Sequence, residues 1–203
     1  VAAKYLARRD SSTVGIVACG VQGRGNLEAL SCVFGIDKVK AYDKFPEVAK
    51  KYAVDMSEKL GLEIEPVQDL EKAVIGMDIV ISSGPIFKDP NPDIEAGWLA
   101  EGSFASPVDY DSYWKPEALR EIDKFATDDK AQMDYYREDG RFNQTPMPYA
   151  DLGEIVAGLK PGRESENERT MSMNLGIALD DMATAILIYN KAKERGIGTD
   201  LPM

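Results

Sequence analysis

The chain has 203 residues, of which 44% are hydrophobic and 29% charged, a composition that suits one globular domain with a real hydrophobic core. Its formal net charge of −11 argues against nucleic acid or an anionic membrane as the main partner. The absence of histidine removes Ser-His and Cys-His nucleophilic machinery and most zinc sites. We interpret Cys19 and Cys32 as small buried thiols. No apolar run approaches the roughly 18 residues of a membrane span and no signal peptide is visible, so we expect a cytoplasmic protein.

The first predicted elements are a helix, a strand and a glycine-rich turn. Residues 1–9 have helical periodicity without an N-terminal cap or an initiator Met, so we predict the end of a helix from a longer protein. A buried strand, residues 14–18, runs into the glycine-rich turn 20–25 and then into a predicted helix, Asn26–Phe34. A helix after such a turn offers unpaired backbone N–H groups and the positive end of its dipole to a pyrophosphate.

The second predicted strand, Lys38–Asp43, ends on an acid about 20 residues after the turn. A dinucleotide-binding fold needs a carboxylate there to accept hydrogen bonds from the adenosine ribose hydroxyls. Strand, turn, helix, strand and terminal acid in this order therefore predict a dinucleotide site. The alternatives are a turn that uses glycine only for its geometry and an acid that is merely a solvated strand end.

The turn departs from the pattern G-x-G-x-x-G at its first position, which is Ala18. Alanine fits a tight turn only if its φ stays negative, so a negative φ is expected there. Gly20 can still give a cofactor close access to the backbone, and Gly23 can still let the helix pack on the strand.

Strands alternate with helices through the rest of the chain, which predicts an α/β, Rossmann-like, doubly wound and mostly parallel sheet. The proline-rich loop 84–92 follows a strand at the edge where ligands bind in such sheets. The last predicted helix, Leu175–Arg195, is amphipathic and ends at Gly196. The other predicted elements are strands at 62–67, 78–83, 102–107 and 124–128 (the last strand of the sheet), helices at 47–60 and 69–74 (the latter with an acidic cap), and a polar loop at 137–149.

Four stretches of the sequence resemble the ornithine cyclodeaminase/mu-crystallin family. They follow one another along nearly the whole chain, and they are Gly20–Arg24, Gly102 through Val108 to Asp111, Gly153–Arg163 and Gly176–Ala185. The resemblance implies a Rossmann domain, here residues 10–170, and a dimerisation and substrate domain built mostly from residues that precede it. Residues 1–9 would end a helix of that preceding segment, and residues 171–203 would carry the C-terminal helix back to it.

The resemblance also implies a set of site residues. Asp111 falls where the family keeps the catalytic aspartate that contacts the substrate amine, and Asp109 competes with it for that role. The implied cofactor is NAD, and the implied cofactor-binding residues are Gly20, Val21, Gln22 and Gly23 at the pyrophosphate, Asp43 at the ribose, Ser82 and Ser83 at the next strand end, and Asn174 near the nicotinamide.

By resemblance, the activity is NAD-dependent chemistry at an amino acid Cα, with cyclodeamination of a diamino acid such as ornithine to proline and ammonia as the first expectation. The alternatives are an amino-acid dehydrogenase or ketimine reductase with net NAD(P)H turnover, and a non-catalytic member that binds a small ligand. The expected partners are a small amino-acid substrate and a second copy of the complete protein. The lysine and arginines with which the family binds the substrate carboxylate would lie upstream of Val1. Tyr110, Tyr113 and Trp114 crowd the loop around Asp111, which disfavours ornithine itself.

Overall fold

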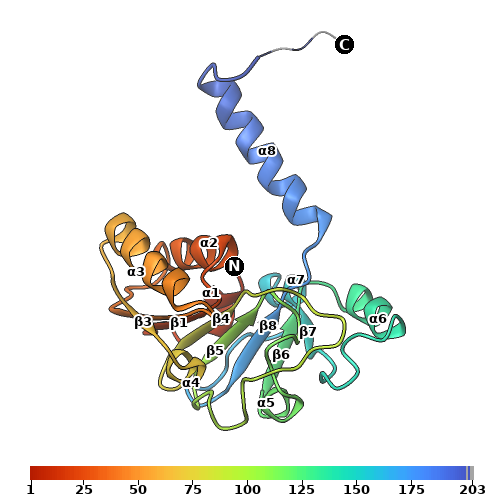
Figure 1. Ribbon diagram of the computed structural model, residues 1–203. Coiled ribbons are helices and arrows are strands. Elements are labelled where there is room, and N and C mark those ends of the chain that lie inside the picture. The colour runs from red at the N-terminus through yellow and green to blue at the C-terminus, as the bar shows by residue number, and fades with distance from the viewer. Residues whose placement is uncertain (200, 202–203) are drawn as a thin grey trace.

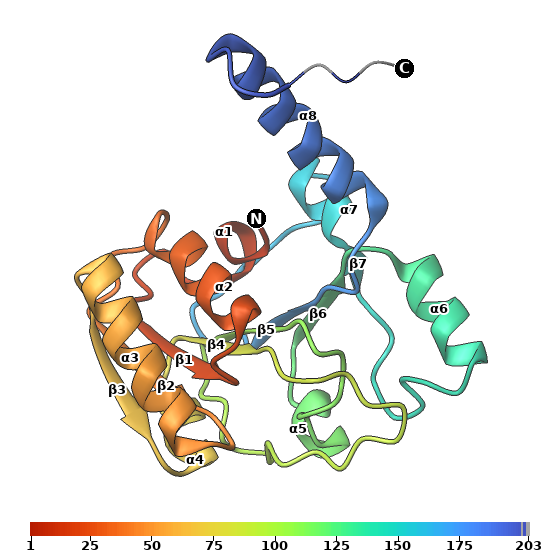
Figure 2. The same ribbon diagram turned by 45° about the horizontal axis from the view of Figure 1, so that its top comes forward.

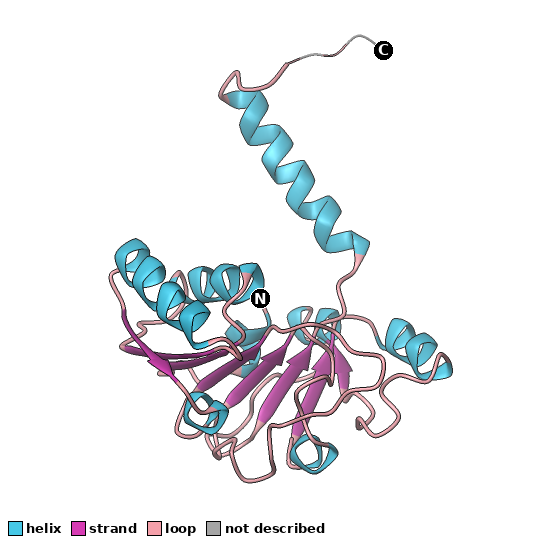
Figure 3. Ribbon diagram, viewed as in Figure 1, coloured by secondary structure: helices cyan, strands magenta, loops and turns pink. Residues whose placement is uncertain are grey.

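The computed structural model describes residues 1–199 and 201, and its centre is one parallel sheet of eight strands (Figures 1 and 3). The strand order is β3-β2-β1-β4-β5-β8-β6-β7, and every pairing is parallel. This is the predicted Rossmann-like α/β sheet. The strands are β1 Thr13–Val17, β2 Lys38–Tyr42, β3 Glu63–Val67, β4 Ile79–Ser82, β5 Phe104–Pro107, β6 Lys124–Thr127, β7 Ala150–Asp151 and β8 Thr170–Met173.

Helices cover both faces of the sheet (Figure 2). One hydrophobic cluster joins the sheet to α1, α2, α3 and α7, and a second cluster joins it to α4, α5 and α6. The sheet is therefore doubly wound, as predicted. The helices are α1 Ala2–Leu6, α2 Val21–Ser31, α3 Pro46–Leu60, α4 Leu70–Val74, α5 Pro116–Arg120, α6 Lys130–Glu138, α7 Leu152–Val156 and α8 Ala178–Glu194.

The register of β1 decides which residues meet at the carboxyl edge of the sheet. Val17 pairs with Tyr42 of β2 on one side and with Ser82 of β4 on the other. The residues that follow these three strand ends therefore lie together at one edge. Because the chain turns away in opposite directions from β1, this edge lies at the topological switch point, where open α/β sheets bind ligands.

The helix after the turn starts earlier than its sequence suggests. α2 begins at Val21, five residues before the predicted start at Asn26. Gly23 and Gly25 lie in its first turns, and glycine is a poor helix former, so this stretch looks like a loop when only propensity is considered.

Two strands of the sheet, β7 and β8, were not predicted, so β6 is not the last strand along the chain. β8 lies between β5 and β6, so the sheet continues through residue 173, past the predicted domain boundary at residue 170. β8 reads Thr-Met-Ser-Met and is buried along its whole length, whereas its sequence is only four residues long, alternates polar and apolar residues as a half-exposed strand would, and has no run of β-branched residues. Its assignment as a strand comes from pairing on both sides. β7 contributes only two residues, Ala150 and Asp151.

The helices of the second half also differ from prediction. Residues 137 and 138 belong to α6, whose N-cap residue Asp129 accepts a hydrogen bond from the Gln132 N–H at 3.0 Å. α8 projects away from the sheet and has no buried residue, so its apolar side chains are not covered by the described part of the chain (Figure 1). The sequence predicts this helix over 175–195, and the structure has it at Ala178–Glu194.

Smaller predictions are confirmed or corrected residue by residue. Cys19 is buried as predicted, whereas Cys32 is exposed at the C-cap of α2. Asp69 does occupy the N-cap of α4, but its side chain makes no capping hydrogen bond and pairs with Lys72 at 2.6 Å. α3 ends at Gly61, as predicted, and Gly61 has the left-handed conformation.

Among the described residues, no helix combines the length and the apolar character that crossing a membrane requires.

Candidate functional site

The turn after β1 holds Ala18 in an unexpected conformation. Its φ is +71°, in the left-handed region, so the expectation of a negative φ is wrong. The backbone is fixed from both sides, because the Ala18 N–H donates to the Tyr42 carbonyl at 2.8 Å and the Ala18 carbonyl accepts from Ser83 Oγ at 2.9 Å. The turn therefore keeps the geometry for which the pattern uses glycine, at a cost of roughly 1–2 kcal/mol for an L-residue.

The structure explains the two glycines that match the pattern, Gly20 and Gly23, in different ways. A Cβ on Gly23 would lie 2.6 Å from the Ala18 carbonyl oxygen, so helix–strand packing requires glycine there, as predicted. Gly20 has φ −78° and ψ −163°, which any residue adopts, and a Cβ there would meet nothing within 4 Å. Neither conformation nor internal packing demands glycine at position 20. A side chain there would instead fill the open space in front of the turn.

The open space at Gly20 lies at the N-terminus of α2. Gly20 is the N-cap residue, and no side chain of the described residues caps this helix. Val21 and Gln22 expose their side chains, and Gly23 completes the first turn. The first N–H groups of α2 and the positive end of its dipole therefore face the space that Gly20 leaves open, an arrangement that fits a phosphate group.

Asp43 lies beside the same turn. Its Oδ2 accepts a hydrogen bond from the Cys19 N–H at 2.9 Å, and its Oδ1 accepts one from the Phe45 N–H at 3.0 Å. Each carboxylate oxygen can accept a further bond. The side chain is half-buried, so the carboxylate is fixed in place and still reachable by ribose hydroxyls.

The two serines at the end of β4, Ser82 and Ser83, have different hydrogen-bonding roles. Ser83 Oγ donates to the Ala18 carbonyl and so secures the turn. Ser82 is completely buried, and its hydroxyl donates to Asp109 Oδ1 at 2.7 Å and accepts from Trp114 Nε1 at 3.0 Å. The Ser82 hydroxyl is thus occupied within the protein, which gives no support to its predicted contact with the cofactor.

Asp109 is the central group of a buried network that the sequence did not reveal. Its side chain is 0% exposed, and its Oδ2 accepts the Gly84 N–H at 2.9 Å while Oδ1 accepts the Ser82 hydroxyl. Burial raises its pKa to about 6 against the opposing effect of these two hydrogen bonds. Asp109 therefore ties the loop after β4 to the loop after β5. It is a buried anchor, in contrast with its neighbour two residues later.

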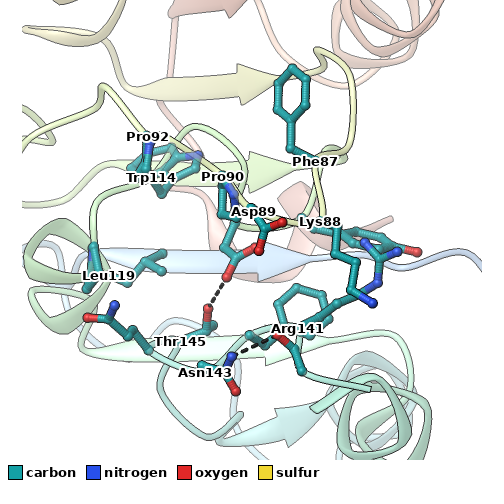
Figure 4. A pocket seen from close by; sticks show the side chains of 16 residues that line it. Phe87, Lys88, Asp89, Pro90, Pro92, Trp114, Leu119, Arg141, Asn143 and Thr145 are labelled. Carbon is teal, nitrogen blue, oxygen red and sulfur yellow. Dashed lines mark hydrogen bonds between the residues drawn. The ribbon is translucent and has the colours of Figure 1, made fainter. Parts of the chain in front are cut away.

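Asp111 lines a pocket of about 300 Å³ between the loops that follow β4, β5 and α6 (Figure 4). Its Oδ2 accepts a hydrogen bond from Thr145 Oγ1 at 3.0 Å. Asp111 is half-buried and lines this pocket, whereas Asp109 does not line it. Of the two candidate aspartates, Asp111 is the one that a small molecule in the pocket could touch.

The pocket brings together charged residues that sequence reasoning did not connect. Lys88 comes from the predicted proline-rich loop and Arg141 from the predicted polar loop, and both line the pocket with Asp89 and Asp111. The position of Lys88 after β4 was a usable signal, because ligands bind at the carboxyl edge of such sheets. Arg141 gave no signal, since only the fold brings its loop to this edge.

Asn174 lies elsewhere. Its Oδ1 accepts a hydrogen bond from Ser172 Oγ at 2.8 Å, and it lines a smaller pocket of about 110 Å³ against α1 and α2. The structure therefore does not bring Asn174 and Asp111 into one cavity.

The parallel sheet, the uncapped helix after a tight glycine turn and the acid at the end of β2 define a Rossmann-like α/β protein. The Ornithine cyclodeaminase/mu-crystallin family matches residues 1–196, and the chain belongs to this family.

Three similar proteins have stated activities. Alanine dehydrogenase of Archaeoglobus fulgidus is 33% identical over 99% of this chain and 63% of its own length. Delta(1)-pyrroline-2-carboxylate reductase of Thermococcus litoralis, solved in complex with NADH and L-proline, is 36% identical, with a TM-score of 0.85 over 98% of this chain and 64% of its own. An archaeal alanine dehydrogenase dimer with bound NAD is 32% identical, with a TM-score of 0.84 over 100% of this chain and 64% of its own. The chain thus spans under two thirds of the length of each of these relatives.

Proposed function

We propose that this chain binds NAD(H) and serves an enzyme that oxidises or reduces an amino acid or its imine at Cα, with net turnover of the cofactor. The observation that carries the proposal is the geometry of the turn, where Gly20 leaves space in front of the uncapped α2 and Asp43 is fixed beside it. A pyrophosphate fits the first feature, and ribose hydroxyls fit the second. Two of the similar proteins are described with NAD or NADH bound, which supports the same cofactor here.

The cofactor supplies the hydride chemistry when it is bound, and the protein supplies position and charge. We assign Asp111 to the substrate amine, whose proton a carboxylate can accept and whose iminium charge it can stabilise. The hydrogen bond from Thr145 occupies Asp111 Oδ2 and fixes the plane of the carboxylate. Oδ1 then remains for the substrate amine.

Net redox chemistry is favoured over cyclodeamination by the relatives with stated activities. The proteins at 32–36% identity are an amino-acid dehydrogenase and an imine reductase, and both reactions change the redox state of the cofactor. Cyclodeamination of ornithine is the second candidate, supported by family membership.

We propose in addition that the complete protein forms a homodimer. The archaeal alanine dehydrogenase is a dimer, and α8 of this chain exposes apolar side chains that a second copy could cover. They include Leu179, Met182, Ile186, Leu187 and Ile188.

The decisive experiment follows cofactor and ammonia together. The protein is incubated with NAD⁺ and L-alanine, L-proline or L-ornithine, and the absorbance of NADH is recorded beside ammonia release. Steady NADH formation supports the proposal. Ammonia release without NADH accumulation would favour cyclodeamination, and cofactor binding without any turnover would contradict both activities.

Asp111→Asn tests the assigned residue. We expect turnover to fall by orders of magnitude while NADH affinity is unchanged. Asp134→Asn, which removes an exposed carboxylate from α6, is the matched control. A larger loss of turnover with Asp109→Asn than with Asp111→Asn would transfer the role to Asp109.

A further inference from the structure

The aromatic residues around Asp111 lie in different places. Tyr110 and Trp114 line the pocket that contains Asp111, whereas Tyr113 does not line it. Tyr113 instead reaches back to the end of β4, where a Cβ built on Gly84 would collide with its hydroxyl oxygen and its ring. The tip of the Tyr113 phenol therefore packs directly on the Gly84 backbone, at the carboxyl edge of the sheet.

Gly84 is adjacent to the turn that we assign to the pyrophosphate. The residue before it, Ser83, donates its N–H to the Val17 carbonyl at 2.9 Å and its hydroxyl to the Ala18 carbonyl at 2.9 Å. The turn, the end of β4 and the tip of the Tyr113 phenol are therefore successive neighbours at the switch-point edge, where open α/β sheets bind ligands. The phenol thus lies beside the proposed cofactor site.

The main chain around Tyr113 is held on both sides. Its carbonyl accepts the Asp93 N–H at 3.2 Å and the Ile94 N–H at 2.8 Å. The next residue, Trp114, is buried and donates its indole N–H to the Ser82 hydroxyl at 3.0 Å. Because these bonds fix the backbone before a ligand binds, the phenol is preorganised and loses little conformational freedom on binding.

The Tyr113 hydroxyl is available as a hydrogen-bond donor. It makes no hydrogen bond to any of residues 1–199 and 201. Burial raises the pKa of the phenol, and the negative charges of Asp109 and Asp43 raise it further, so the hydroxyl keeps its proton at neutral pH. A half-buried, protonated hydroxyl beside a site for an anion can donate a charge-assisted hydrogen bond to that anion.

We infer that the Tyr113 hydroxyl donates a hydrogen bond to the phosphates of the dinucleotide and so helps to bind the ADP half of the cofactor. This inference rests on the proposed function, because it requires a dinucleotide at the turn. It brings a residue of the loop after β5 into the cofactor site. Asp111 lies two positions earlier on that loop, so a bound cofactor would also hold the segment that carries the proposed substrate ligand.

Tyr113→Phe separates the hydroxyl from the packing of the ring. Phenylalanine still covers Gly84, so circular dichroism should show an unchanged fold. The affinity for NADH, measured by fluorescence titration, should fall at least tenfold, because a hydrogen bond to a charged group contributes about tenfold or more. Tyr135→Phe, which changes an exposed tyrosine of α6 in the same way, is the matched control and should leave NADH affinity unaltered. Equal affinity of Tyr113→Phe and the unmutated protein for NADH would overturn the inference.

Displacement of NADH by ADP and by adenosine locates the contact. ADP keeps both phosphates, so Tyr113→Phe should weaken ADP binding by the same factor as NADH binding. Adenosine lacks the phosphates, so its inhibition constant should be the same for both proteins. A loss confined to NADH would place the contact on the nicotinamide half, and an equal loss for adenosine would place it on the nucleoside. Either result would overturn the inference.

The unmutated protein separates this inference from the proposed function. If it binds neither NADH nor ADP, the proposed function fails and the inference fails with it. If it binds NADH and Tyr113→Phe binds NADH equally tightly, the inference alone fails and the turn remains the proposed cofactor site.

Discussion

The Asp43 carboxylate accepts a hydrogen bond from the main-chain N–H of Cys19 at 2.9 Å. This bond joins the end of β2 to the turn after β1, so the proposed ribose ligand and the proposed phosphate site move as one unit. A cofactor that bridges them would meet a geometry set before it binds, which reduces the entropy cost of binding.

The position of Asp43 predicts a preference for NADH over NADPH. A carboxylate accepts hydrogen bonds from ribose hydroxyls and repels a 2′-phosphate, whereas the neighbouring Lys44 weakens that repulsion. We therefore expect tighter binding of NADH without exclusion of NADPH, as measured by fluorescence titration of both. Asp43→Asn, which keeps an acceptor and removes the charge, should narrow the difference. Tighter binding of NADPH to the unmutated protein would refute the assignment.

Gly20→Val should abolish dinucleotide binding and leave the fold intact. The backbone conformation of Gly20 suits any residue, and a Cβ there meets no protein atom within 4 Å, so the new side chain occupies only the space proposed for the pyrophosphate. Circular dichroism and NADH titration measure the two effects separately. Gly23→Val is the contrasting variant and should unfold or strongly destabilise the protein, because its Cβ would lie 2.6 Å from the Ala18 carbonyl oxygen. Unchanged NADH affinity in Gly20→Val would exclude this turn as the site.

Ala18→Gly should stabilise the protein, although alanine to glycine usually destabilises. At φ +71° the alanine carries roughly 1–2 kcal/mol of strain, and the added freedom of glycine in the unfolded chain costs about 0.4–1 kcal/mol. The expected net gain in the free energy of unfolding is about 0.5 kcal/mol, measured by urea denaturation. A loss of stability would mean that the left-handed conformation does not strain this turn.

Asp109 should make stability depend on pH. Because burial raises its folded pKa to about 6, above that of an unfolded aspartate, its contribution to stability is fully present below about pH 4 and is lost as the pH rises through 6. Asp109→Asn has no such titration. Relative to the unmutated protein, the variant should therefore gain up to about 3 kcal/mol between pH 4 and pH 8, measured by urea denaturation at each pH. A difference that does not change with pH would contradict the raised pKa.

The first half of the fold was predictable because its signals are local. The apolar run of β1, the glycines after it and the spacing to Asp43 are all contained in a short stretch of sequence. The structure has β1 and β2 within one residue of their predicted bounds, although α2 begins five residues earlier than predicted. α3 and its end at Gly61 were predicted for the same reason, since helical periodicity and a left-handed glycine act within a few residues.

Some of the site residues could likewise be selected from local sequence spacing, whereas others were distinguished only by the fold. Sequence spacing selected Gly23, where a Cβ would collide with the Ala18 carbonyl oxygen, and Asp43, whose carboxylate accepts the Cys19 N–H. The role of Asp43 toward a ribose stays a prediction. Spacing could not separate Asp109 from Asp111, because they are two residues apart on one loop. Burial against Ser82 and Gly84 makes Asp109 an anchor, and the fold of the loop turns Asp111 toward the pocket.

The sequence by itself determined the β1–turn–α2–β2 unit and the acid that completes it, because short apolar runs, glycine positions and spacing act between near neighbours in the chain. The insertion of β8 between β5 and β6, the left-handed φ of Ala18 and the meeting of Lys88, Asp111 and Arg141 around one cavity were decided only by the tertiary structure. Strand pairing, desolvation and the closing of a pocket depend on residues that are distant in sequence, and no local pattern records which of them will meet.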